Sequence, residues 1–189
     1  CSTVPSDYQT PGLGCMLTGA LGVPSAAVDL NGACAGFVYA LDMADAYIRA
    51  GKARKILIVS AEANSRLCDW NDRATAVLFG DGAGAVVVGE GEGFLAAHLN
   101  VKANIDVLVA WPELGNSPWA KEHQHPFTPL YMAGQDVYKF AVNASLSDIM
   151  TVCTKAGIAT DEVDFFVLHQ ANKRIIDAAQ QRLRQPVAK

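Results

Sequence analysis

A cysteine flanked by glycines is the strongest candidate for chemistry in this sequence. Cys34 lies in Asn31-Gly-Ala-Cys-Ala-Gly-Phe37, with one glycine two residues before it and another two residues after it. The apolar run 26–30 precedes this motif and a helical pattern follows it, which predicts a nucleophile at a tight turn from strand to helix. Free N–H groups and the dipole at the helix start favour a thiolate, so we expect a lowered pKa and partial exposure for the Cys34 thiol. The alternative is a small buried cysteine packed at a strand end.

A histidine stands at a second position of the same kind. His169 follows the apolar run 164–168, which is predicted to be a strand, and a helical pattern follows the histidine. Sites in α/β sheets form beyond the carboxyl ends of strands, so Cys34 and His169 could make a thiolate–imidazole pair. A histidine with a purely structural role at a strand end is the alternative.

Two further motifs could bind ligands, but their surroundings argue against both. His123-Gln-His125 could be half of a metal site, yet no third ligand accompanies the pair, and we expect no metal. Gly80-Asp-Gly-Ala-Gly84 could cradle a phosphate, yet no helix follows and no lysine has the required spacing. The five cysteines form no Cys-x-x-Cys pair, so the sequence indicates neither a zinc site nor a disulfide framework.

Composition narrows the class of protein. The 189-residue chain is 51% hydrophobic, enough to bury a substantial core, and its net charge of −4 argues against nucleic acid as the main partner. No window resembles a transmembrane helix or a signal peptide, so we expect a cytoplasmic protein without membrane contact. The chain begins with Cys1 and ends at Lys189 directly after a helical pattern, which leads us to expect a piece of a longer protein.

Apolar periodicity predicts alternating strands and helices. The predicted helices cover residues 15–21, 37–50, 132–156 and 170–183, residues 1–14 are a predicted loop, and residues 160–163 are a predicted turn or helix start. The predicted strands cover residues 26–30, 55–60, 94–100 and 164–168, and residues 75–79 and 83–88 form a predicted hairpin around Gly80-Asp-Gly82. This order predicts an α/β fold with mixed strand pairing where the hairpin lies.

Four motifs make the sequence similar to a known family. They are Asn31–Phe37, the pair Asp72-Arg73, the segment Phe79–Gly84, and His169-Gln-Ala-Asn-Lys-Arg-Ile175. In order and approximate spacing, the chain resembles the β-ketoacyl-acyl-carrier-protein synthase III enzymes of the thiolase superfamily. The resemblance implies an α/β, thiolase-like fold with α-β-α-β-α layers. We expect this fold to be incomplete here, because the N-terminal and C-terminal parts found in the family are absent from the sequence. Residues 1–100 would be the remainder of the N-terminal half with the nucleophile, and residues 101–189 the start of the C-terminal half with the histidine.

The resemblance also implies a reaction. Cys34 would take the acyl group from an acyl-CoA primer and pass it to the carbanion formed by decarboxylation of malonyl-acyl carrier protein, which initiates fatty acid biosynthesis. His169 would hydrogen-bond the malonyl thioester oxygen, a role that the family shares with an asparagine absent from this chain. The family needs no cofactor beyond these substrates and forms homodimers. Because the asparagine is absent, we expect the chain alone to have little or no condensing activity.

Binding residues follow from the same resemblance. Arg73 matches the arginine that flanks the CoA adenine, and the pantetheine tunnel is matched by Gly134, Tyr138, Ala171 and Asn172. Ordinary packing in a loop or helix is the alternative role for each of them.

Partner and primer binding can also be predicted at named positions. Five basic residues against one acidic residue give residues 173–189 a local charge of +4, so Arg174 and Arg182 are expected to bind the acidic carrier protein. A solvated helix face is the alternative. Thr10 matches an acyl-pocket position before Pro11, where members restricted to short primers carry phenylalanine, so we expect longer acyl chains to fit.

Three other functions remain open from the sequence. Related condensing enzymes of polyketide, alkylquinolone or hydroxymethylglutaryl type share the motifs. An α/β-hydrolase with a cysteine nucleophile would also use Gly-x-Cys-x-Gly, although no aspartate is placed convincingly as its third member. A non-catalytic thiolase-like module is the third, and it would not need both Cys34 and His169.

Overall fold

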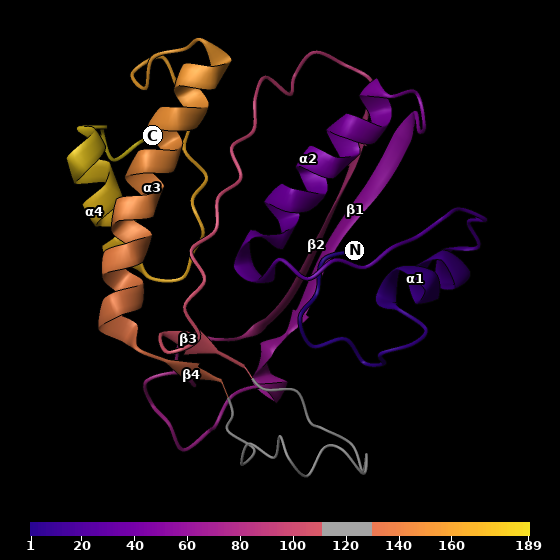
Figure 1. The fold of residues 1–189 in the computed structure, drawn as a ribbon, viewed down its shortest axis with the longest axis horizontal. Helices are drawn as coiled ribbons and strands as arrows, with labels where there is room; N and C mark the ends of the chain where they lie inside the picture. The colour runs from indigo at the N-terminus through magenta and orange to yellow at the C-terminus, as the bar shows by residue number, and fades with distance from the viewer. Residues whose placement is uncertain (111–129) are drawn as a thin grey trace. The chain divides into compact units, whose positions relative to one another are not determined.

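The computed structural model describes residues 1–110 and 130–189 (Figure 1). The chain forms two compact units, the first made of Cys1–Arg66 with Gly80–Leu99 and the second of Leu67–Phe79 with Asn100–Lys189. The histidine pair His123 and His125 lies outside the described residues.

A two-stranded antiparallel ladder is the centre of the first unit. Strand β1 (Lys55–Ala63) pairs with β2 (Asp81–Gly89) without interruption. On the other side of β1, the Ser2 N–H donates to the Val59 carbonyl at 2.7 Å, and the Ala61 N–H donates to the Ser2 carbonyl at 3.0 Å. The first segment of the chain therefore pairs with β1, although the sequence predicted a loop there.

Ser2 also joins a third parallel segment to this arrangement. It makes parallel bridges both to Ser60 of β1 and to Leu30. The Leu30 N–H donates to the Cys1 carbonyl at 2.8 Å, and the Thr3 N–H donates to the Leu30 carbonyl at 3.2 Å. The backbone order is thus Leu30, Ser2, β1 and β2, with parallel pairing on one side of β1 and antiparallel pairing on the other. The sequence predicted mixed pairing at a different place, where the hairpin of residues 75–79 and 83–88 was expected.

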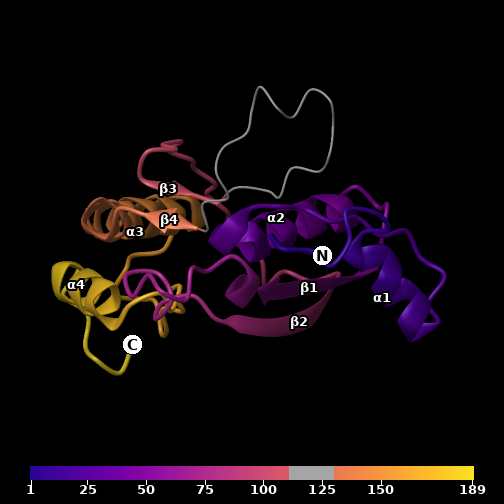
Figure 2. The same ribbon diagram turned by 90° about the horizontal axis from the view of Figure 1, so that it is seen from below.

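Two helices belong to the first unit. Helix α1 covers Leu13–Leu21, and α2 covers Gly36–Arg49, which runs along one face of the β1–β2 ladder (Figures 1 and 2). The buried core joins Ala40 and Ala44 of α2 to Ile58 of β1. Gly51 has a left-handed φ of 67° and turns the chain back after α2. Helix α2 and β1 are therefore antiparallel, and α2 begins beside the end of β1.

Among the described residues, the second unit contains a short ladder and two helices. Strand β3 (Leu108–Val109) pairs with β4 (Tyr131–Met132), and α3 (Gly134–Ala156) lies beside α4 (Lys173–Leu183) in both views (Figures 1 and 2). None of the described helices is long and apolar enough to cross a membrane.

The predicted hairpin is wrong. Residues 73–78 form consecutive turns, and the partner of β2 is β1. The reason lies in Asp72, whose carboxylate accepts the Thr75 hydroxyl at 2.7 Å and the Ala74 N–H at 2.9 Å. The Leu78 N–H then donates to the Thr75 carbonyl at 2.9 Å, so local hydrogen bonds occupy the backbone of this apolar run.

Three other predicted strands form no ladder in the described structure. Residues 94–100 and 164–168 have no strand assignment, and of residues 26–30 only Leu30 makes a bridge. Apolar alternation makes a strand only where a neighbour offers backbone groups. In 164–168, the Phe166 N–H donates to the Lys189 carbonyl at 2.8 Å instead, and Val167 is 86% exposed.

Candidate active site

Cys34 lies on a 3₁₀ turn, Ala33–Ala35, that leads directly into α2. The residue is exposed, as the sequence predicts for a nucleophile. Ala33 has a left-handed φ of 45°, while Gly32 has a φ of −116° and Gly36 a φ of −55°. The predicted tight turn is present, but an alanine and not a glycine adopts its left-handed backbone.

The two glycines are needed for close approach of the backbone. A Cβ atom at Gly32 would lie 2.9 Å from the Cα atom of Gly36, too close for a real side chain. A Cβ atom at Gly36 would overlap the Ser2 hydroxyl oxygen and lie 3.0 Å from the Ser2 Cβ. The Gly-x-Cys-x-Gly spacing therefore lets the turn fold on itself and pack against the segment that pairs with β1.

The expected lowering of the Cys34 thiol pKa is wrong in direction. Burial of the sulfur by surrounding atoms raises the pKa most, the backbone N–H of Cys34 lowers it through a hydrogen bond, and the charge of Glu62 raises it. The residue as a whole is exposed, while the atoms around its sulfur still displace part of the water there. The protonated thiol is the favoured form, because desolvation outweighs the backbone hydrogen bond.

Glu62 is the residue of this site that the sequence analysis missed. Its Oε2 accepts the Val4 N–H at 3.0 Å. Burial raises the pKa of the Glu62 carboxyl, and the hydrogen bond from Val4 lowers it by a smaller amount. The signal in the sequence is a carboxylate near the carboxyl end of a predicted strand, the position where sites of α/β proteins form.

Thr10 is the other predicted site residue of the first unit. Its side chain is exposed, and the peptide bond to Pro11 is cis.

The predicted histidine and the residues after it belong to the second unit. His169 and Ala171 are exposed and precede α4. Asn172 is the N-cap of α4, where its Oδ1 accepts the Arg174 N–H at 2.9 Å. This hydrogen bond gives Asn172 a structural role at the start of the helix and uses its side-chain oxygen.

Arg73 stands in the turns that replace the predicted strand. Its neighbour Asp72 accepts the hydroxyl of Thr75, which is 1% exposed. This hydrogen bond, followed by the N–H of Ala74, holds the pKa of the Asp72 carboxyl below its usual range. Arg73 itself is exposed on a segment whose backbone is fixed by these contacts.

The predicted residues of α3 and α4 lie on helix surfaces. Gly134 and Tyr138 are exposed and one turn apart at the start of α3. Arg174 and Arg182 are exposed on α4, and the Arg182 Nη1 donates to Oδ1 of Asn143 on α3 at 2.9 Å.

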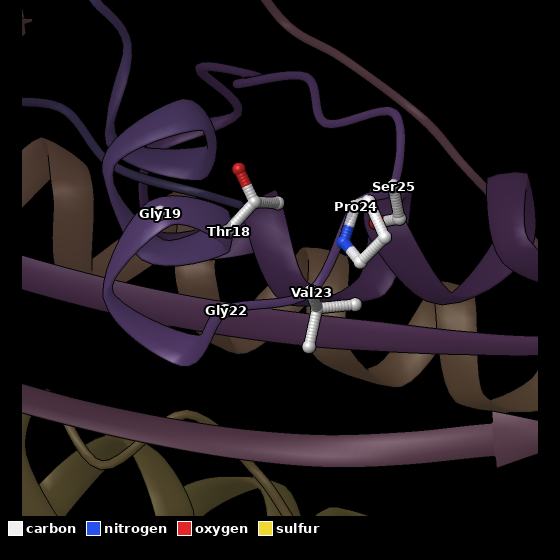
Figure 3. Close-up of a pocket in the computed structure, with 6 residues that line it drawn as sticks. All are labelled: Thr18, Gly19, Gly22, Val23, Pro24 and Ser25. Atoms are coloured by element: carbon white, nitrogen blue, oxygen red, sulfur yellow. The ribbon is translucent and has the colours of Figure 1, made fainter.

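Two shallow hollows among the described residues hold none of the predicted site residues. One, at the end of α1, has a volume of about 500 Å³ and is lined by Thr18, Gly19, Gly22, Val23, Pro24 and Ser25 (Figure 3). It contains no side chain that titrates near neutral pH. Within the described part of the chain, no three His, Cys, Asp or Glu side chains gather as metal ligands. The candidate chemistry therefore rests on Cys34 and His169.

Comparison with family models assigns both of these residues to matched segments. Residues 28–103, which include Cys34, match the model for 3-oxoacyl-[acyl-carrier-protein (ACP)] synthase III. Residues 153–189, which include His169, match the model for the C terminal of the same synthase III.

Individual relatives give the same result. The chain is 42% identical over 188 residues to the β-ketoacyl-[acyl-carrier-protein] synthase III of Xanthomonas campestris pv. campestris, covering 98% of this chain and 58% of that protein. A solved synthase III from Thermus thermophilus has a TM-score of 0.89 and 40% identity, covering 98% of this chain and 58% of the solved one. The priming β-ketosynthase of the R1128 polyketide pathway has a TM-score of 0.84 and 31% identity, covering 99% and 57%.

These likenesses confirm the predicted α/β, thiolase-like fold. The chain spans a little over half the length of the curated relatives it matches.

Proposed function

Because the chain belongs to the 3-oxoacyl-[acyl-carrier-protein] synthase III family, we propose that it carries the nucleophile and the histidine of a β-ketoacyl-ACP synthase III. The proposed reaction is the decarboxylative condensation of an acyl-CoA primer with malonyl-ACP, which initiates fatty acid biosynthesis. The observation that carries the proposal is an exposed cysteine on the glycine-packed turn into α2, within the segment that matches the family. Both thioesters are substrates, and no further cofactor is proposed.

Acyl transfer is the first proposed step. The sulfur of Cys34 attacks the carbonyl carbon of the acyl-CoA thioester, a new carbon–sulfur bond forms, and CoA leaves as its thiol with one proton. Since the thiol of Cys34 is favoured in its protonated form, a base must remove its proton as the bond forms. The exposed face of the residue supports this step, because a bulky thioester has to reach the sulfur.

Condensation is the second proposed step. Loss of CO₂ from malonyl-ACP leaves a carbanion, which attacks the acyl carbonyl; a carbon–carbon bond forms and the Cys34 sulfur is released as a thiolate. The proposed role of His169 is to donate a hydrogen bond to the malonyl thioester oxygen while negative charge develops there. Its exposure on the segment before α4 supports access of a substrate. The sequence contains no Asn-Thr-Ser motif to supply the second donor found in the family.

Substrate binding is proposed for the second unit. Arg73 would hold the adenine end of CoA, because a guanidinium binds phosphate oxygens and stacks on rings. The fixed turn around Asp72 and Thr75 supports this role, since it presents the arginine on a defined backbone. Gly134, Tyr138, Ala171 and Asn172 are proposed to contact the pantetheine arm. For Asn172 only the Nδ2 group is proposed as a contact, because its Oδ1 caps α4.

Carrier-protein binding is proposed for the surface of α4. Arg174 and Arg182 are exposed, and the hydrogen bond of Arg182 to the neutral Asn143 leaves its charge uncompensated there. Lys173, by contrast, is paired with the carboxylate of Asp177 at 2.7 Å. In Arg174→Ala and Arg182→Ala variants of the full protein, we expect weaker association with carrier protein and a shallower dependence on salt. Lys173→Ala is the matched control, with a smaller effect expected. Unchanged salt slopes in both arginine variants would remove this assignment.

Other parts of the proposal concern assembly and primer choice. Residues 1–100 and 101–189 are proposed to be parts of the two thiolase-like halves, and the full protein is proposed to be a cytoplasmic homodimer. A small side chain at Thr10 supports a pocket for primers longer than acetyl, which octanoyl-CoA and acetyl-CoA in competition would test. Rejection of octanoyl-CoA by the full protein would contradict it.

A second candidate function is the loading of polyketide primers. The observation that favours it is the 31% identity and TM-score of 0.84 to a priming β-ketosynthase of a polyketide pathway. Turnover with carrier proteins of fatty acid and polyketide type would separate the two functions.

Acyl transfer can be tested on the 189-residue chain by mass spectrometry of the intact protein and its peptides. With acyl-CoA we expect one acyl adduct on Cys34, loss of the adduct in Cys34→Ala, and no change in Cys15→Ala, where another exposed cysteine is removed. A stable adduct with little p-nitrophenyl ester hydrolysis supports acyl transfer, and rapid ester turnover without an adduct would favour a hydrolase. Condensation with malonyl-ACP is measured in the same samples, and we expect little or none.

A further inference from the structure

Three parallel backbone segments end beside the Cys34 turn. Leu30, Ser2 and Ser60 are neighbours through parallel bridges, so the residues that follow them lie at one edge of this arrangement. Cys34 follows the first segment, Val4 the second and Glu62 the third. The 3.0 Å hydrogen bond from the Val4 N–H to the Glu62 Oε2 ties the second and third ends together.

The side chain of Glu62 is directed by the register of β1. Ile58, Ser60 and Glu62 are at every second position of the strand and therefore share one of its faces. Ile58 packs against α2 on this face. Since α2 and β1 are antiparallel, the end of that face lies beside the start of α2, where Cys34 stands. Ser60, one position earlier on this face, has a buried hydroxyl oxygen with no hydrogen-bond partner among the described residues. The edge next to the thiol is therefore polar and partly closed to water.

We propose that Glu62 is a positioning residue of the Cys34 site, where its carboxylate anchors Val4 beside the turn and adds a negative charge to the edge at which Cys34 reacts. The inference rests on the proposed role of Cys34 as nucleophile. The charge of Glu62 disfavours a neighbouring thiolate, so the thiol keeps its proton until a base acts during acyl transfer.

Charged groups on the neighbouring elements have partners of their own. Asp81 of β2 accepts the Ser65 hydroxyl at 2.7 Å, and Arg66 pairs with Asp7 at 2.6 Å. Cys1, in the second segment, accepts the Leu30 N–H at 2.8 Å through its carbonyl. Among the residues that the structure describes, Glu62 is the one whose charge acts on the Cys34 thiol.

The test is the pH profile of Cys34 alkylation in the 189-residue chain. Iodoacetamide is added between pH 6 and 10, and mass spectrometry of peptides gives the rate at Cys34, with exposed Cys15 as an internal reference. Glu62→Gln removes the charge and keeps an acceptor for Val4, while Glu62→Asp keeps a charge on a shorter side chain. Glu90→Gln is the matched control, because it removes an exposed glutamate just after β2.

We expect Glu62→Gln to shift the Cys34 profile to lower pH and to raise the rate at pH 7 by roughly threefold, since higher thiolate content outweighs the lower nucleophilicity of a more acidic thiol. Glu62→Asp should stay near the wild-type rate, and Glu90→Gln and every Cys15 rate should not change. Equal acceleration in Glu62→Gln and Glu62→Asp would overturn the proposal, because it would indicate loosened packing. An unshifted profile in Glu62→Gln would overturn it as well.

The same samples separate this inference from the proposed function. If acyl-CoA labels Cys34 but the alkylation profile does not respond to Glu62, the inference fails and the function stands. If the profile responds but no acyl adduct forms, Glu62 acts on a thiol that is not an acyl-transfer nucleophile, and the function fails.

Discussion

Gly36 gives the sharpest test of how the Cys34 turn is packed. It has φ −55° and ψ −37°, a right-handed helical backbone that alanine adopts without strain. On helix propensity alone, Gly36→Ala would stabilise the protein by about 1 kcal/mol. The new methyl group, however, would overlap the Ser2 hydroxyl oxygen and lie 3.0 Å from the Ser2 Cβ. The two effects have opposite signs, so stability measures which one dominates.

The contact with Ser2 should dominate because Ser2 cannot move away. Ser2 is 2% exposed, and its backbone N–H and carbonyl are both hydrogen-bonded to β1, to Val59 at 2.7 Å and to Ala61 at 3.0 Å. Rotation of its hydroxyl would remove one overlap and leave the Cβ contact. Overpacking of this kind costs about 1–3 kcal/mol, and a severe overlap lies at the upper end of that range. After the gain in helix propensity, we expect a net loss of about 2 kcal/mol.

Urea unfolding followed by circular dichroism measures this change. Gly19→Ala in α1 is the matched control, because a Cβ there would meet no heavy atom within 4 Å, and it should stabilise the protein by about 0.5–1 kcal/mol. In a double-mutant cycle, Ser2→Gly should remove most of the loss caused by Gly36→Ala. The packing argument is refuted if Gly36→Ala stabilises as Gly19→Ala does, or if Ser2→Gly does not restore stability.

Three further changes test the turns and caps of both units. Asn172→Ala should lower the free energy of unfolding in urea by about 1 kcal/mol, because the Arg174 N–H loses its acceptor, while Asn172→Asp should keep it unchanged. Equal stability of the two variants would contradict the role of Asn172 as N-cap. Thr75→Val removes the main hydrogen bond that lowers the pKa of Asp72, so that pKa, followed by NMR, should rise toward its usual range. The stability that Asp72 contributes is complete above its unfolded pKa and is lost as pH falls through its folded pKa, so the Thr75→Val variant should lose less stability on acidification than the wild type. An Asp72 pKa that is the same in the variant and the wild type would refute the assignment. Ala33→Gly relieves the strain of a φ of 45° but adds chain entropy to the unfolded state, so the free energy of unfolding should change by less than about 1 kcal/mol. A larger loss of stability would contradict the interpretation that Ala33 is strained.

Local patterns predicted the helices well because their causes are local. The apolar period of residues 37–50 predicted α2, and Ala40 and Ala44 of that period are its buried face. Gly51 and Gly157 end α2 and α3 in left-handed conformations, as glycines after a helical run are expected to do. Helix starts were less certain: α4 begins at Lys173, three residues later than predicted, because Asn172 caps it.

Strand pairing could not be predicted in the same way. Ser2 pairs with Leu30 and Ser60, which are 28 and 58 residues away, and its segment is too short to show alternation. The turns at residues 75–79 depend on the carboxylate of Asp72, which a periodicity count of the apolar run does not include. The strand predictions that were wrong thus failed for two reasons. Strands depend on backbone hydrogen bonds between distant segments, and a single side-chain acceptor can fold an apolar run into turns.

The candidate site divides along the same line. The position of Cys34 before a helix follows from local glycines and periodicity, and the structure places it there. The protonation of its thiol depends on burial and on Glu62, 28 residues later in the chain, so a motif alone gave the wrong direction. Position and reactivity are nevertheless coupled through Gly36. The absence of a side chain at Gly36 lets the turn pack against Ser2, and the packing that fixes Cys34 also brings the turn to the strand edge where Glu62 lies. A cysteine held in this way gains a defined position, and its thiol keeps its proton until a base removes it.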